Sequence, residues 1–432
     1  MTQQQKAAVW MIGALLAVSL GAFAFLGGYL VRKTTEPVVA SAPSTAAATS
    51  VAAGNAAPAS GASASSSASV DFSVLQEIDN VLKANYVDPS RLQDQQALKQ
   101  GAIDGLLNTV GDTHQVYVRP EDVQFESTDL SGQFEGIGAT VQQKNGQVSI
   151  ESLIPDYPAA KSGKLKPGDI ILAVDGQSMQ GKTSTDVVKV IRGRAGTNVT
   201  ISVQHNDGSK EDITLTRAQI LITSVHADQI KDANGNPVSD LAYLRISQFQ
   251  QSTDKEVADY LKSIQGKGYK GLILDLRNNP GGYLQQTENV LGDFLKPGQT
   301  VLITQDRNGK ETVDKASAQS VSTDLPVVVL VNKNSASASE ITAGAIQADG
   351  RGKVLGEQTF GKGTVNQFFP LPKDGGELYV SIARWLTPNH ETIEGKGITP
   401  DMVVHLGDND DPQSYFNAQL YAAIDYLHQG NP

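Results

Sequence analysis

Residues 331–367, VNKNSASASEITAGAIQADGRGKVLGEQTFGKGTVNQ, decide how the rest of the chain is interpreted. The segment just before them, 325–331 (LPVVVLV), is continuously apolar and rich in β-branched residues, which predicts a strand buried on both faces. Small polar residues then lead into a segment of helical spacing that begins near Glu340. Further strands are predicted at 241–246, 271–277 and 377–382, and helices at 254–264 and 285–294. This alternation from about residue 218 to 405 predicts a mainly parallel sheet covered by helices.

Three serines, Ser335, Ser337 and Ser339, stand between the predicted strand and the predicted helix. At such a junction free backbone N–H groups and the helix dipole favour negative charge, so an oxyanion formed by serine attack on a carbonyl would lie near donors. Lys362 follows between two glycines, and a lysine acts as a general base where burial lowers its pKa towards neutrality. The spacing alone also fits a plain loop with a helix cap, and a lysine in a turn or an anion site.

Histidine and cysteine chemistry have little support in this sequence. The stretch 331–367 contains no histidine and no G-x-S-x-G motif, so a Ser-His-Asp triad has no local basis. The six histidines are scattered without metal-ligand spacing, and the chain has no cysteine, which excludes disulfides, thiolate metal sites and a cysteine nucleophile. We therefore expect no metal site and no cofactor.

The motifs SASASEI (335–341), TFGKGTV (359–365) and, upstream, LDLRNNPGG (274–282) resemble those of the carboxyl-terminal processing (tail-specific) serine peptidases. The resemblance extends over about 71–405. It implies a multidomain α+β chain whose α/β (crotonase/ClpP-like) peptidase domain, expected at 218–405, uses a Ser-Lys dyad. It also implies that Ser337 is the nucleophile and Lys362 the base. Activity would then survive histidine replacement and rise with pH as the lysine deprotonates.

The same resemblance points to residues that would support the dyad. A glutamine four residues after the lysine commonly orients it, but here that position is Asn366 and Gln367 is one residue later, so either side chain is a candidate. The oxyanion donors would come from the amide of Gly281 or Gly282 and from that of Ala338. A glycine turn without a catalytic role is the competing interpretation of the pair.

Residues 131–217, with LKPGDIILAVDG at 165–176, resemble a PDZ domain. Such domains bind an extended peptide at a sheet edge and hold its terminal carboxylate on backbone N–H groups. The capturing loop would comprise Phe134, Gly136, Ile137 and Gly138, where glycine lets the backbone approach the carboxylate closely. Arg192 matches an arginine thought to couple the domain to the active site; a solvated arginine at a helix end and turn-forming glycines are the alternatives.

The N-terminal part indicates a membrane anchor and a tether. Residues 7–31 are almost continuously apolar and uncharged, which predicts a single transmembrane helix; cleavage after an A-x-A-like site in the following segment is the alternative. Residues 34–69 are almost wholly Ala, Ser, Thr, Pro and Gly, which predicts a disordered linker. The resemblance implies that the catalytic part lies on the extracytoplasmic side of the cell membrane.

Two further segments flank the main domains. A small helical module is predicted at 71–130, which by resemblance either helps a homodimer to form or packs beside the peptide-binding domain; a plain helical cap on the next domain is the alternative. The segment 406–432 contains a predicted helix at 415–427 without an assigned role.

The net charge of −11 argues against a nucleic-acid partner, because phosphate binding needs a basic face. The expected partners are protein or peptide substrates with apolar C-terminal tails. Two other functions remain open: a scaffold that captures tails without cutting them, favoured by Asn366, and a hydrolase of non-peptide esters or amides on the same dyad.

Overall fold

The computed structural model describes residues 70–123, 132–144, 146–318, 321–407, 410–411 and 414–430. The membrane helix expected at 7–31 and the linker expected at 34–69 lie outside these ranges. Within them, no helix combines the length and the apolar character needed to cross a membrane. The chain divides into two compact units, one of which contains the described residues 70–113 and the other those from His114 onward.

The smaller unit is helical, as the sequence predicts, but it ends at residue 113 and not at 130, because the strand β1 (Val116–Val118) already belongs to the larger unit. It contains α3 (Ser73–Asn85), the 3₁₀ helix η1 (Pro89–Leu92) and α4 (Gln95–Val110). Asp94 caps α4 by accepting a hydrogen bond from the amide of Ala97 at 2.9 Å, and Gly111 ends it in the left-handed conformation. No residue of either α-helix is buried, so their apolar side chains have no core within this unit.

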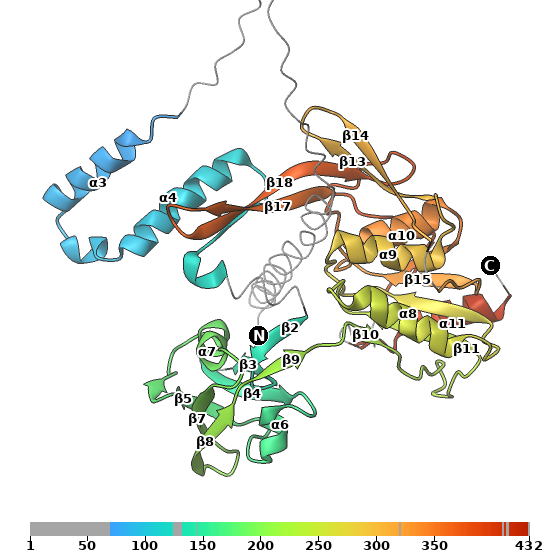
Figure 1. Cartoon of the computed structure of the whole chain (residues 1–432), viewed down its shortest axis with the longest axis horizontal. Helices are drawn as coiled ribbons and strands as arrows, with labels where there is room; N and C mark the ends of the chain where they lie inside the picture. The colour runs from blue at the N-terminus through green and yellow to red at the C-terminus, as the bar shows by residue number, and fades with distance from the viewer. Residues whose placement is uncertain are drawn as a thin grey trace, which may run out of the picture. The chain divides into compact units, whose positions relative to one another are not determined.

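The larger unit contains a six-stranded sheet in which five neighbouring strands are parallel (Figure 1). Its order is β10-β11-β12-β15-β16-β19, with only β10 antiparallel to its neighbour. The bounds are β10 Val225–His226, β11 Leu241–Ile246, β12 Gly271–Asp275, β15 Val327–Val331, β16 Gly352–Gly356 and β19 Met402–Val403. β12 and β15 are buried over their whole length, which confirms the prediction from their apolar runs.

Helices cover both faces of this sheet. On one face lie α8 (Thr253–Ile264), α9 (Leu284–Phe294) and α10 (Ala338–Ala348), whose apolar side chains share a core with Leu274 and Val329. The other face is covered by α11 (Ala418–His428), whose leucines and Ile424 pack with Ile273 and Val328. A domain boundary at residue 405 therefore cuts off a helix that belongs to the sheet, and the domain extends to the end of α11.

An antiparallel sheet lies beside the parallel one in the larger unit, and the sequence predicted only its strand near 377–382. Its order is β1-β18-β13-β14, and β17 also pairs with β18. The bounds are β1 Val116–Val118, β13 Thr300–Asp306, β14 Glu311–Lys315, β17 Thr364–Leu371 and β18 Gly376–Leu386. Since β17 begins at Thr364, Lys362 lies in the loop that enters this sheet.

The segment that resembles a PDZ domain forms an antiparallel sheet in the order β3-β4-β5-β7-β8, with β6 on β5, around its own apolar core. The strands are β3 Ala139–Lys144, β4 Gln147–Leu153, β5 Ile170–Val174, β6 Gln177–Ser178, β7 Asn198–Gln204 and β8 Lys210–Thr216, and the helices are α6 Pro158–Ser162 and α7 Ser184–Ile191. β7 pairs with β5 on one side and with the last strand of the domain, β8, on the other. A two-stranded pair, β2 (Gln133–Gly136) with β9 (Ala218–Leu221), joins the chain where it enters and leaves.

Candidate active site

The three serines before α10 have different environments. The hydroxyl of Ser335 donates to the carbonyl of Leu276 at 2.8 Å, and that of Ser339 donates to the carbonyl of Asn279 at 2.9 Å. The Oγ atom of Ser337 is fully buried and has no hydrogen-bond partner among the described residues. A buried hydroxyl normally finds a partner, so Ser337 alone of the three has the free hydroxyl that a nucleophile requires.

Ser337 also has an unusual backbone conformation, with φ 54° and ψ −115°. A side chain at positive φ is strained by roughly 1–3 kcal/mol, which the surrounding structure must offset. Here the offset comes from the N-terminus of α10, where the amide of Ser337 donates to the Glu340 carboxylate at 2.8 Å. Because of this conformation, the residue directly before α10 does not follow the helical path.

The glycine pair lies directly against this serine. Gly281 has φ 107°, and a Cβ built on it would lie 2.8 Å from the Ser337 Cβ and 3.0 Å from the Ala338 amide nitrogen. Gly281 therefore has to be glycine for both its conformation and the close approach. Its own amide donates to Oδ1 of Asn279 at 2.8 Å, whereas the amides of Gly282 and Ala338 have no acceptor among the residues described. These last two N–H groups are the ones open to an oxyanion.

Two loops are held together beside Ser337. The carbonyl of Asn279 accepts hydrogen bonds from the Ala336 amide at 3.0 Å and from the Ser339 hydroxyl at 2.9 Å, and its Nδ2 donates to Ile246. The loop after β12, which carries the glycines, is thus bonded to the serine loop on both sides of Ser337. The relative position of nucleophile and candidate oxyanion donors depends on these bonds.

Glu340 connects the serine to the lysine. Its fully buried carboxylate accepts four hydrogen bonds, from the amides of Ser337, Lys362 and Gly361 and from the Thr359 hydroxyl, at 2.6–2.9 Å. Burial raises the pKa of Glu340, and these four donors oppose that rise. Four donors fill the lone-pair positions of a carboxylate, so the site is built for the ionised form.

Lys362 is only 2% exposed. Its backbone is held on both sides, because its amide donates to Glu340 and its carbonyl accepts from the Trp385 indole at 2.8 Å. Its Nζ donates to the hydroxyl of Tyr379 at 3.5 Å and lies 5.5 Å from the centre of that ring. Burial raises the pKa of Tyr379 well above its usual value, so this hydroxyl keeps its proton beside the amine.

The structure places the two candidates for orienting the lysine on β17. Asn366 is buried, and its Nδ2 donates to the carbonyl of His114 at 3.1 Å and to the hydroxyl of Ser381 at 3.0 Å, while its Oδ1 accepts from Thr364. Its hydrogen bonds are therefore directed away from the lysine amine in this conformation. Gln367 pairs with Val380 across the strands and makes no side-chain hydrogen bond within the described part of the chain.

A histidine and a glutamate lie next to the lysine loop. Nε2 of His114 is 3.0 Å from Oε1 of Glu394, and Oε2 of Glu394 accepts from the Gly363 amide at 2.7 Å. Burial alone would raise the pKa of Glu394. His114, the Gly363 amide and Lys362 together have the larger opposite effect, so the pKa is lowered and the carboxylate is held in the ionised form. Through its hydrogen bond to Glu394, the backbone of Gly363, the residue after the lysine, is held in place as well.

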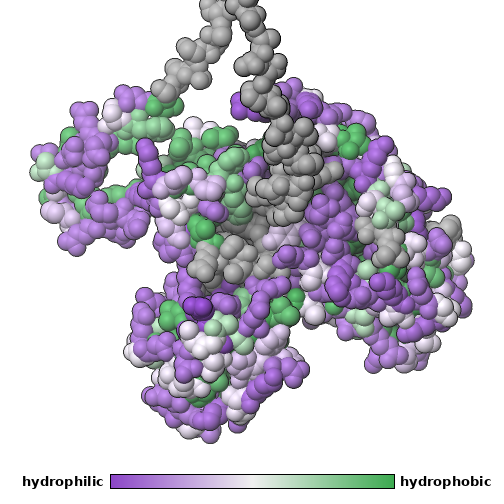
Figure 2. Space-filling view, in the orientation of Figure 1, coloured by the Kyte–Doolittle hydropathy of each residue, from purple (hydrophilic) through white to green (hydrophobic). Residues whose placement is uncertain are grey.

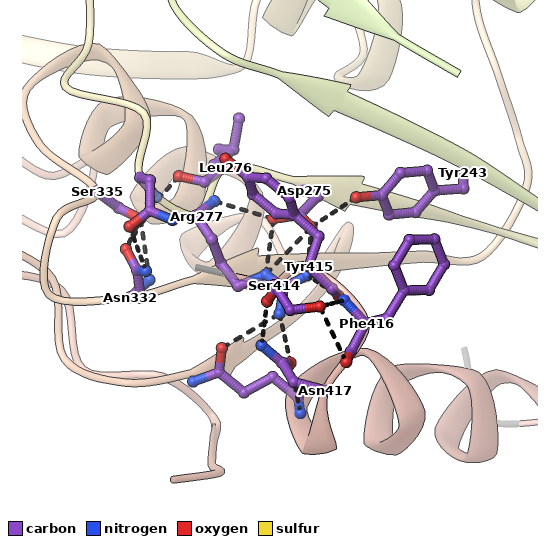
Figure 3. A network of polar contacts seen from close by, with 12 residues as sticks. Tyr243, Asp275, Leu276, Arg277, Asn332, Ser335, Ser414, Tyr415, Phe416 and Asn417 are labelled. Carbon is purple, nitrogen blue, oxygen red and sulfur yellow. Dashed lines mark hydrogen bonds and ion pairs between the residues drawn. The ribbon is translucent and has the colours of Figure 1, made fainter. Parts of the chain in front are cut away.

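A second polar network stands behind the glycine loop, at the end of β12 (Figure 3). Arg277 and Asp275 form a buried ion pair, with Nη2 and Oδ2 at 2.6 Å, and the Tyr243 hydroxyl donates to the same carboxylate at 2.8 Å. The remaining donors of the guanidinium point at the segment before α11, where the carbonyl of Tyr415 and the side chain of Asn417 accept them.

The predicted peptide-binding residues line one groove of about 550 Å³ between β3 and α7. Its walls are largely apolar, from Phe134, Ile137, Ile154, Val188, Ile191 and Ile222. β3 is an edge strand, so its free side can pair with an added strand. Gly136, Gly138 and Arg192 also line the groove, and the Arg192 guanidinium lies 4.5 Å from the centre of the Phe134 ring.

The glycine at 138 also has a structural requirement. Its φ is 77°, and a Cβ there would lie 2.4 Å from the Cβ of Tyr157. The alternative interpretation of these glycines as turn-forming residues is therefore correct for Gly138, and it is compatible with a role in the groove.

Sequence reasoning missed several residues that shape the site, namely Glu340, Tyr379, Trp385, Asn279, His114 and Glu394. Glu340 carried a usable signal, because a serine followed three residues later by a glutamate is the pattern of a capping box. Apart from the local bond between Asn279 and the Gly281 amide, the others lie 17 to 280 residues from the partners they hold, and no local pattern connects them.

Comparison with known proteins gives two family matches. The description of peptidase family S41 matches residues 240–404, and that of the PDZ domain matches residues 149–205. Carboxy-terminal processing protease CtpB of Bacillus subtilis (strain 168) is 38% identical over 330 residues, which cover 75% of this chain and 65% of that protein. CtpA of the same organism is 35% identical over 337 residues, covering 78% of this chain and 70% of that protein.

Among solved structures, a photosystem II D1 C-terminal processing protease is 26% identical and covers 78% of this chain and 94% of its own, with a TM-score of 0.45.

Proposed function

Because this chain belongs to peptidase family S41, which includes the carboxy-terminal processing proteases, we propose that it is a serine endopeptidase that cleaves proteins after capturing their C-terminal tails. Ser337 is the nucleophile and Lys362 the general base. The observation that carries this proposal is the buried hydroxyl of Ser337, which has no partner in the described part of the chain and lies on a loop bonded through Glu340 to the loop of the buried Lys362.

The proposed reaction runs in two halves. The neutral amine of Lys362 accepts the proton of the Ser337 hydroxyl as Oγ attacks the scissile carbonyl, and the oxyanion is stabilised by the amides of Gly282 and Ala338. When the tetrahedral intermediate collapses, the C–N bond breaks and Lys362 returns the proton to the leaving amine. Water then attacks the acyl-enzyme ester with the lysine again as base, which releases the new carboxylate and restores the serine.

The groove between β3 and α7 supports the proposed capture of tails. An extended peptide adds to the free edge of β3, its last side chain enters the apolar pocket, and its carboxylate lies near the loop at 134–138. The apolar lining favours tails that end in aliphatic or aromatic residues. This groove and the candidate active site therefore contribute different parts of the substrate contact.

We also propose that the protein forms homodimers through its helical unit. The apolar side chains of α3 and α4, such as Leu75, Ile78 and Leu106, are about half exposed, and Figure 2 shows green apolar residues among the purple surface of this unit. Helices of 13 and 16 residues are marginal in water without a packed face, and a second copy would supply one.

The membrane anchor at 7–31 and an extracytoplasmic catalytic part remain proposals that rest on the apolar run of the sequence. Fractionation of cells with and without residues 1–33, followed by protease protection of the catalytic part, tests both.

The deciding experiment is cleavage of unstructured peptides with apolar C-termini, read by mass spectrometry so that activity and cut site are found together. The wild type is expected to cleave, and Ser337→Ala and Lys362→Ala are expected to lose cleavage while they still bind the tail.

A specific observation favours a second candidate, a tail-binding scaffold without turnover: Asn366 stands where a glutamine is common, and its hydrogen bonds go to His114, Thr364 and Ser381. Tail binding by a wild type that leaves every peptide intact would support this second function.

A further inference from the structure

The segment that leads into the last helix holds the loop that carries the oxyanion glycines. This segment, 414–419, lies beyond the part of the chain that matches the peptidase family, 240–404. We propose that residues 415–419 are a positioning device of the catalytic centre, acting through Arg277 on the loop 277–282. The proposal deepens the proposed function and rests on it.

Arg277 depends on this segment for those hydrogen bonds that Asp275 does not accept. It is 2% exposed, so its donors need partners inside the protein. Asp275 accepts from Nε and Nη2, while Nη1 donates to Oδ1 of Asn417 at 2.7 Å and more weakly to Gln419 at 3.4 Å. In the described part of the chain, the side-chain acceptors for Nη1 therefore come from the C-terminal segment alone.

Tyr415 adds two more contacts. Its carbonyl accepts from Nη2 of Arg277 at 2.8 Å, and its ring lies 5.6 Å from the Arg277 guanidinium and 4.4 Å from that of Arg245. Figure 3 shows the arginine side chain reaching from the end of β12 towards Tyr415 and Asn417. A guanidinium held in its plane by acceptors on three sides has one defined position.

From Arg277 the path to the catalytic centre is short. The next residue, Asn278, has a positive φ of 58° and donates its amide to Asn332 at 3.0 Å. Asn279 follows with the bonds to Ala336, Ser339 and the Gly281 amide, and Gly281 lies against Ser337. A displacement of Arg277 would therefore also displace the amide of Gly282, because only the hydrogen-bonded residues 278–281 lie between them.

Asn417 allows a sharp test because it has two separable roles. Its Oδ1 caps α11 by accepting from the Gln419 amide at 3.2 Å, and the same atom accepts from Arg277. Serine caps a helix as well as asparagine does, but its shorter side chain does not reach the guanidinium. Asn417→Ser therefore removes the contact with Arg277 and keeps the cap, whereas Asn417→Asp keeps both. The two variants lose the hydrogen bond from Nδ2 to the Ser414 carbonyl alike, so this loss does not distinguish them.

The experiment compares Asn417→Ser, Asn417→Asp and the control Leu420→Ala, which weakens the packing of α11 without touching Arg277. All are full chains, measured below their melting temperatures on the cleaved peptide. We expect kcat of Asn417→Ser to fall about 10-fold, as for a disturbed oxyanion donor, with KM within about 2-fold. Asn417→Asp should keep kcat within about 2-fold, and Leu420→Ala should lower the melting temperature but not kcat.

Hydrogen exchange supplies a readout that does not require turnover. Amides in 276–284 should exchange faster in Asn417→Ser than in the wild type, while those of the domain with β3 and α7 stay unchanged. A wild type that cleaves, together with unchanged kcat and exchange in Asn417→Ser, overturns the positioning role, as does an equal loss of kcat in Leu420→Ala. A wild type that does not cleave overturns the proposed function instead, and the exchange result then decides the positioning role alone.

Discussion

The backbone amides of Ser337 and Lys362 donate to the same atom, Oε2 of Glu340, at 2.8 and 2.9 Å. The two loops that carry the candidate nucleophile and base therefore share one buried carboxylate. Because an unpaired buried carboxylate or amide is costly, the two loops are expected to keep their relative position during turnover. The first prediction follows from this relationship.

Replacing the carboxylate by an amide should separate the loops. Glu340→Gln puts an NH₂ group among four donors, so at least one amide of Ser337, Lys362 or Gly361 loses its acceptor. We expect a loss of about 2–4 kcal/mol in the free energy of unfolding and a fall in kcat of at least about 10-fold. Urea denaturation and peptide cleavage measure both, with the exposed Glu391→Gln as matched control; a stable, fully active Glu340→Gln would contradict the role.

The serines should differ in what their removal does. Ser337→Ala should abolish cleavage with little change in stability, because its hydroxyl has no hydrogen-bond partner to lose among the described residues. Ser335→Ala should keep most activity and lose about 1–2 kcal/mol, because it deprives the Leu276 carbonyl of a buried donor. Cleavage rates and melting curves of the two variants, prepared side by side, provide the measurement. Equal activity in both would reject Ser337 as the nucleophile.

The two polar side chains after the lysine can be ranked. Asn366→Ala should lower both stability and cleavage, because its buried amide donates hydrogen bonds to His114 and Ser381 beside the loop that carries Lys362. Gln367→Ala should change the cleavage rate by less than about 2-fold and the free energy of unfolding by less than about 0.5 kcal/mol, as is usual for a side chain without such contacts. If instead only Gln367→Ala lost activity, the glutamine would be the residue that orients the lysine.

A charge in the apolar wall of the groove between β3 and α7 should weaken its binding of tail peptides. Val188→Asp places a carboxylate where the last side chain and carboxylate of a tail would lie, so affinity for a fluorescent apolar tail peptide should drop at least about 10-fold. Lys210→Ala, on the opposite edge strand of the same sheet, is the control and should bind as the wild type does. Fluorescence anisotropy measures the affinities, and unchanged binding by Val188→Asp would place the tail elsewhere.

Stability should depend on pH through Asp293. Burial, with a smaller contribution from Asp254, raises the pKa of this carboxyl to about 7. A raised pKa stabilises the folded state below the unfolded value of 3.8, and this contribution is lost as pH rises through about 7. Asp293→Asn removes the titration, so its stability relative to the wild type should rise by about 1.4 kcal/mol per pH unit up to about pH 7, and its advantage should be larger at pH 8.5 than at pH 5 by roughly 2–3 kcal/mol. Thermal unfolding at the two pH values is the test, and a difference that does not change with pH would contradict it.

Much of the fold could be predicted because its signals are local. The apolar runs of β12 and β15 and the helical spacing of α8 and α9 are properties of a few neighbouring residues, and these elements begin and end close to the predicted positions. The antiparallel sheet of β13, β14 and β17 was missed because its strands are mixed in polarity and pair with partners far along the chain. Contacts between distant strands leave little trace in the sequence of either one.

The sequence by itself determined the chemical inventory of this protein: a serine at the start of a helix, a lysine between glycines, a glycine pair after a buried strand, and no histidine or cysteine among them. Only the tertiary structure decided which serine keeps a free hydroxyl, that Glu340 accepts from both the serine and the lysine, and that α11 belongs to the catalytic domain. The physical reason is that residue type and spacing act over a few residues, whereas burial and hydrogen bonding depend on which distant segments are packed together.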